Sequence, residues 1–153
     1  MKEVILFAHP TFGVLGIIAA VWIFVEALNA DEANAGRIKT AAYAVTLFIV
    51  LAWLVGGYFY VLDYGADKAI IMAGSWSWAH SFFMETKEHL FFIPLILALY
   101  LPIVARLNLA VDRSARAMVM AVSALIVLSG LAIEGAGAII SFGVRVGLAQ
   151  AGA

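Results

Sequence analysis

Apolar residues gather in four long runs along the chain, and short polar segments separate these runs. The runs cover roughly residues 4–28, 41–62, 79–105 and 117–141. A helix of about 20 residues crosses the ~30 Å hydrocarbon core of a bilayer, so each run is long enough to span it. The pattern predicts an all-α integral membrane protein. Its four transmembrane helices would form an up-down bundle in a single domain over residues 1–153.

The segment between the second and third runs is not an ordinary polar loop. Residues 69–73 are apolar but too few to span a membrane, and Trp76 and Trp78 follow a Gly-Ser pair. Tryptophan side chains favour the membrane–water interface. We therefore predict a short interfacial helix between the second and third transmembrane helices.

The first apolar run follows Lys2, as the apolar region of a secretory signal follows a basic residue. However, the run is long for a signal and contains His9 and Glu26. We therefore expect it to be retained as a helix, with Glu26 in a structural pair with Arg37 or Lys39.

Composition supports the membrane assignment and excludes several classes of function. The chain is 65% hydrophobic and only 12% charged, unlike a soluble domain. It contains no cysteine, which excludes disulfides, cysteine-ligated zinc and iron–sulfur clusters. The net charge of −1 and the lack of a basic tract exclude a nucleic-acid partner.

Basic residues indicate the orientation. The two connections that follow the first and third runs lie on the same side of the membrane if all four runs span it. They contain five of the nine Lys and Arg residues, namely Arg37, Lys39, Arg106, Arg113 and Arg116. The positive-inside rule therefore favours both termini outside, in the periplasm, for a protein of the bacterial inner membrane.

Seven ionisable residues fall in the same half of the predicted bundle, near its outer end. They are His9, Asp63, His80, Glu85, Glu88, His89 and Glu134. Each such group costs about 2.5–3.5 kcal/mol to insert in an apolar span, so it usually faces a partner or a cavity. We expect Glu134 to pair with Lys87, Arg145 or a histidine. The shared depth of these groups predicts a functional site there.

Helical spacing suggests which of these residues face inward. Glu85 and His89 are four residues apart and share a face of the third helix, whereas His80 lies on the opposite face. We predict that Glu85 and His89 face the bundle and that His80 is interfacial. Small residues follow His9 and flank Glu134 on single helix faces, at Gly13, Gly16, Gly130 and Gly137.

Two histidines above small residues, on helices that lie diagonally in an up-down bundle, suit a flat ligand. In this the chain resembles small four-helix membrane b-type cytochromes and haem-bearing quinone-reactive subunits. The resemblance implies haem b with His9 and His89 as axial ligands, bounded by the four glycines. It also implies electron exchange between a membrane quinone and a larger membrane or periplasmic redox complex. Glu85, Glu88 and Asp63 would then handle protons.

Three alternatives stay open. One is a transition metal held by His9, His89, Glu85 and Glu134, with His80 as a weaker ligand, although the Glu-x-x-His spacing of di-iron proteins is missing. Another is an accessory or proton-relay subunit of a larger complex, or a small transporter. The glycines have a purely structural alternative, because small residues let membrane helices pack closely.

Overall fold

The computed structural model describes residues 2–152, which are helical and contain no strand. Four helical stretches are long and apolar enough to cross a membrane, which confirms the predicted class of fold. The elements are α1 (Lys2–Leu28), α2 (Ala35–Leu62), α3 (Tyr64–Ala73), the π-helix η1 (Ala79–Met84), α4 (Glu85–Leu90), α5 (Phe92–Val104) and α6 (Arg113–Ala151). The third of the long stretches, Ala79–Val104, comprises η1, α4 and α5.

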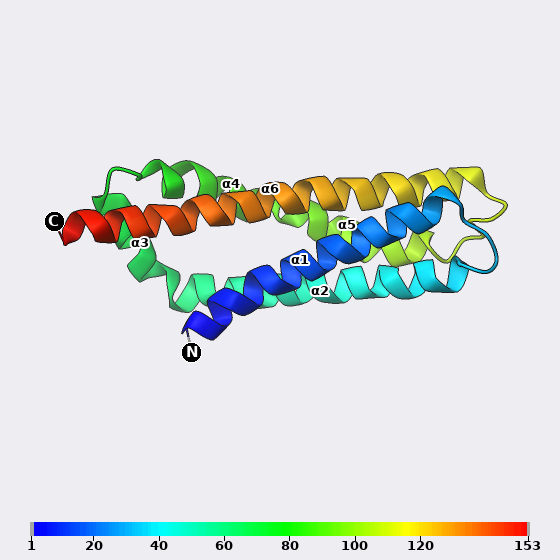
Figure 1. Cartoon of the computed structure of the whole chain (residues 1–153), viewed down its shortest axis with the longest axis horizontal. Helices are drawn as coiled ribbons and strands as arrows, with labels where there is room; N and C mark the ends of the chain where they lie inside the picture. Colours follow the sequence, from blue (N-terminus) through cyan, green and yellow to red (C-terminus); the bar gives the residue numbers. More distant parts are fainter. Residues whose placement is uncertain (1, 153) are drawn as a thin grey trace.

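The long helices lie side by side along one axis (Figure 1). Helix α1 packs against α2 and α6, and α5 packs against the same two helices from the other side. The α1–α2 and α5–α6 connections lie at one end, which we call the connecting end. Both termini and α3 lie toward the other end, which we call the terminal end (Figure 1).

Two helices begin earlier than their apolar runs, because polar caps rather than hydrophobicity set their starts. Helix α2 begins at Ala35 instead of 41, after Asn34 and Asp31 exchange backbone-to-side-chain hydrogen bonds of 2.9 Å. Helix α6 begins at Arg113 instead of 117, where the Asp112 carboxylate accepts hydrogen bonds from two backbone N–H groups. Helix α6 also continues to Ala151, ten residues past the predicted end at 141.

Apolar packing is concentrated at the connecting end. Fully buried side chains from all four long helices meet there, including Ile23, Ile38, Val45, Leu101 and Ile126. A second, smaller cluster at the terminal end consists of Tyr64, Ile71, Ala79 and Ile140. The core is therefore divided into two parts.

Glycines in α6 allow α3 and η1 to approach it closely. A Cβ atom at Gly147 would lie 2.6 Å from the backbone oxygen of Ile70, and one at Gly143 would lie 2.9 Å from the Ala79 Cβ. Helix α6 extends beyond the end of α2, and α3 lies along this extension (Figure 1). Only residues without side chains fit at these two contacts.

The expected Glu26 pair is confirmed at the connecting end. Arg37 donates from Nε and a terminal nitrogen to the two carboxylate oxygens of Glu26, each at 3.0 Å. This bidentate ion pair joins the end of α1 to the start of α2.

Candidate functional site: a polar cavity at the terminal end

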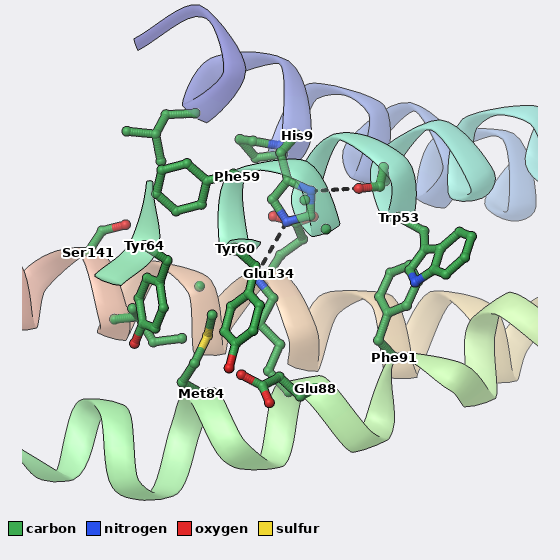
Figure 2. A pocket seen from close by; sticks show the side chains of 18 of the residues that line it. His9, Trp53, Phe59, Tyr60, Tyr64, Met84, Glu88, Phe91, Glu134 and Ser141 are labelled. Carbon is green, nitrogen blue, oxygen red and sulfur yellow. Dashed lines mark hydrogen bonds between the residues drawn. The ribbon is translucent and has the colours of Figure 1, made fainter. Parts of the chain in front are cut away.

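A cavity of about 480 Å³ lies between α1, α2, α4 and α6 toward the terminal end (Figure 2). Its walls are mainly apolar and include the rings of Trp53, Phe59, Phe91 and Phe92. The polar and ionisable side chains on the walls are His9, Tyr60, Tyr64, Asp67, Lys87, Glu88, Glu134 and Ser141. A mainly apolar cavity with a few polar groups is the usual form of a small-molecule site.

His9 is fixed by hydrogen bonds on both ring nitrogens. Its Nδ1 lies 2.9 Å from the backbone oxygen of Ala52, so Nδ1 carries the proton and donates it. In the neutral ring Nε2 is then an acceptor, and the Lys87 ammonium lies 3.5 Å from it. The two bonds connect α1 to α2 and α1 to α4 (Figure 2).

Lys87 also interacts electrostatically with Glu134 of α6. Both side chains are largely withdrawn from solvent, and a charge in such a place needs an opposite charge nearby. The structure thus selects Lys87 among the partners expected for Glu134. His9, Lys87 and Glu134 form a polar triad contributed by three different helices.

Three glycines provide the space for this triad. A Cβ atom at Gly56 would lie 2.6 Å from His9 Cε1, and one at Gly137 would lie 3.1 Å from Lys87 Nζ. A Cβ atom at Gly13 would collide with the Glu134 carboxylate. Each polar side chain therefore lies against the bare backbone of a neighbouring helix.

Glu88 forms a second polar position on the cavity wall. The Tyr60 hydroxyl points toward its carboxyl group (Figure 2). The Oε1 atom of this carboxyl group is buried and has no hydrogen-bond partner within residues 2–152.

Beside the cavity, Tyr64, His80 and Glu85 form a polar chain that leads to the surface. The Tyr64 hydroxyl lies 2.9 Å from His80 Nδ1, and His80 Nε2 lies 3.6 Å from Glu85 Oε1. Tyr64 and His80 are only 3% and 4% exposed. Burial raises the pKa of Tyr64 well above that of a free tyrosine. His80 lies in η1, and π-helical turns often occur at functional positions.

The prediction of which third-helix face points inward is corrected. His89 is exposed, and its Nδ1 donates to the backbone oxygen of Glu85 on its own helix at 2.6 Å. The Glu85 side chain is 52% exposed. His80, predicted to be interfacial, is buried instead.

The reason is visible in the side chains that follow along α5. The face that continues from Lys87 carries Phe91, Pro94, Ala98 and Leu101, three of which are buried. The face that continues from Glu85 and His89 carries exposed Phe92, Ile96 and Ile103. Small residues and prolines mark the packed side of a membrane helix, and bulky apolar residues mark its lipid side.

Other candidate residues lie apart from the cavity. Asp63 does not line it. Gly16 and Gly130 are covered by Ile49 and Ile17, at 2.8 Å from where each Cβ would lie, so they serve helix packing. Within residues 2–152, no group of three or more His, Asp or Glu side chains has the geometry to hold a metal ion.

The histidine positions do not fit a haem with two histidine ligands. Such a haem needs both imidazoles directed at one plate, and of the two expected ligands only His9 lines the cavity. Both His9 nitrogens already have partners. Of the four expected bounding glycines, only Gly137 lines the 480 Å³ cavity.

Sequence reasoning missed Lys87 as the centre of the site and missed Trp53, Gly56, Tyr60 and Tyr64 as parts of it. Lys87 had a usable signal, because it lies on the same helix face as Pro94, Ala98 and Leu101. The tyrosines and Trp53 had none, since aromatic residues at the ends of membrane helices are ordinarily interfacial.

Comparison of the chain with protein-family models, curated proteins and solved structures gave no match.

Proposed function

We propose that this chain is a bacterial inner-membrane protein that binds a quinone or quinol in the cavity at its terminal end. In this proposal the bundle has up-down topology, both termini are periplasmic and α3 lies at the outer interface. A larger membrane redox complex would exchange electrons with the bound compound. The observation that carries the proposal is an aromatic-walled cavity of about 480 Å³ whose polar end presents Lys87.

The shape and polarity of the walls suit a flat ring with carbonyl oxygens. Aromatic side chains such as Trp53, Phe59 and Phe91 can stack on or enclose such a ring. Lys87 has three N–H donors, and His9 Nε2 uses only one of them. One of the two remaining N–H groups can face the Glu134 carboxylate, and the other can serve a carbonyl oxygen inside the cavity.

The cavity walls also suit entry from lipid. Leu6, Trp53 and Phe92 line the cavity and are at least 40% exposed. A quinone with an isoprenoid tail partitions into the bilayer and meets these side chains first. Its tail would stay among lipid chains while its ring occupies the cavity.

The test is a titration of the purified protein in detergent with decylubiquinone, followed by tryptophan fluorescence. The chain has four tryptophans, of which Trp53 lines the cavity. We expect saturable quenching that largely disappears in Trp53→Phe. Loss of a charged donor in Lys87→Met should weaken binding about tenfold or more, since hydrogen bonds to charged groups contribute about 1.5–3 kcal/mol.

The matched control is Lys39→Met, which removes an exposed lysine near the connecting end and should bind as the wild type does. Absence of saturable quenching would overturn the proposal. So would equal affinity in Lys87→Met and wild type. Competition by palmitate at equal affinity would replace the quinone class with a fatty-acid ligand.

A further inference from the structure

Glu88 carries an unmet hydrogen-bonding requirement at the cavity wall. Its Oε1 atom is buried and unpartnered within the described part of the chain, while the Tyr60 hydroxyl points toward the same carboxyl group. A buried carboxyl oxygen without a donor is costly. Because Glu88 lines the cavity, an occupant that donates a hydrogen bond to the carboxyl group, and turns it toward the cavity, would relieve this cost.

Lys87 and Glu88 offer opposite chemistry to one space. They are consecutive on α4, so their side chains leave the helix about 100° apart, and both line the cavity. Lys87 extends toward His9, whereas Glu88 extends toward Tyr60 (Figure 2). An ammonium donates hydrogen bonds and a carboxylate accepts them. The cavity therefore has one donating and one accepting position.

We propose that Glu88 makes the site selective for the reduced, hydroxyl-bearing form of its ligand. This inference rests on the proposed quinone-class function. A quinone ring offers only acceptor oxygens, which Lys87 can serve and Glu88 cannot. A quinol has two hydroxyl groups, each both a donor and an acceptor, so it satisfies Lys87 and Glu88 together. The site thus binds the quinol in preference to the quinone.

The experiment compares the dissociation constants of decylubiquinol and decylubiquinone, measured by the tryptophan titration on the purified chain. We expect the wild type to bind the quinol about tenfold more tightly, the effect of one hydrogen bond to a carboxylate. In Glu88→Gln the preference should fall to about one, because the amide adds donors that serve the quinone. The matched control is Glu32→Gln, an exposed acid in the α1–α2 connection away from the cavity, which should keep the preference.

A second variant protects the test against a folding defect. Glu88→Asp keeps the charge but withdraws the carboxylate from the cavity, and the preference should again fall toward one. Equal wild-type affinity for both forms would overturn the selectivity while leaving quinone binding in place. An unchanged preference in Glu88→Gln or Glu88→Asp would overturn the role of Glu88. Failure of the wild type to bind either form would instead overturn the proposed function.

Discussion

Gly56 and Gly57 are adjacent in α2 but have different surroundings. A Cβ atom at Gly56 would lie 2.6 Å from His9 Cε1, whereas nothing lies within 4 Å of one at Gly57. The His9 ring is held by bonds on both nitrogens and cannot move away without breaking one. Gly56 therefore has a steric role that its neighbour lacks.

We predict that Gly56→Ala lowers the free energy of unfolding by about 1–3 kcal/mol, the usual cost of overpacking. Gly57→Ala should leave it unchanged or raise it slightly, because alanine favours the helix. Thermal unfolding in detergent, followed by circular dichroism, measures both. Equal melting temperatures for the two variants would contradict the close approach of His9 to α2.

Lys87 and Glu134 should be energetically coupled. Lys87→Met removes the cation that interacts with the Glu134 carboxylate and should cost about 1–3 kcal/mol, the usual range for a polar group that loses its partner. Glu134→Gln leaves the ammonium unpaired at a similar cost. The double variant should recover most of the loss, which a double-mutant cycle on unfolding free energies would show. Additive costs would mean that the two groups do not stabilise each other.

At the scale of the element, α3 depends on its contact with α6. A Cβ atom at Gly147 would meet the backbone oxygen of Ile70, which cannot rotate aside as a side chain can. We predict that Gly147→Ala weakens the docking of α3 and speeds tryptic cleavage after the exposed Lys68. Gly135→Ala, on the same helix with nothing within 4 Å of its Cβ, is the control. Cleavage at the wild-type rate in both would show that α3 docks without this contact.

The ionisation of Tyr64, the first residue of α3, should make the stability of the protein depend on pH. Its folded-state pKa is raised by burial, so its contribution to stability is complete below about pH 10, the unfolded value, and is lost as pH rises toward the folded value. We predict that Tyr64→Phe flattens the loss of stability above about pH 10. Tyrosinate absorbance during an alkaline titration provides the measurement, with Tyr64 ionising later than a free tyrosine in the wild type. A fully normal wild-type titration would contradict the burial of Tyr64.

The elements were predictable to different degrees. The four long helices follow directly from the apolar runs, because a single apolar segment that crosses a membrane satisfies its backbone hydrogen bonds by forming a helix. The starts of α2 and α6 were misplaced because the Asp31 and Asp112 carboxylates, which accept hydrogen bonds from backbone N–H groups at these starts, lie outside the apolar runs. The inward face of the third helix was also misjudged. Its histidine and glutamate were given more weight than Pro94 and Ala98, which mark the packed side.

The sequence predicted how far along the bundle the site lies, but it did not predict which side chains contact one another there. His9, Glu88 and Glu134 share one cavity, consistent with their common distance from the bundle end. The approach of Lys87 to His9 depends on how α1 and α4 are placed around α2 and α6. No periodicity within one helix contains that information.

The whole molecule allows a direct test of orientation. The chain has no cysteine, so a single introduced cysteine has no background. We predict that Ala149→Cys, exposed near the terminal end, reacts with a membrane-impermeant maleimide on spheroplasts. Ala33→Cys, exposed in the α1–α2 connection, should react only after lysis. The reverse pattern would place the cavity in the cytoplasmic half of the bilayer.

The division of the core means that the two ends of the bundle are held together in different ways. The connecting end is filled by buried apolar side chains such as Ile23 and Leu101. At the terminal end, the backbones of α1 and α4 make no close contact in the described part of the chain, and the Lys87–His9 bond bridges them. One hydrogen bond of 3.5 Å thus joins two helices whose backbones do not pack against each other. A molecule that hydrogen-bonds to the Lys87 ammonium would therefore act on the one contact that joins α1 to α4, and the packing at the connecting end would stay as it is.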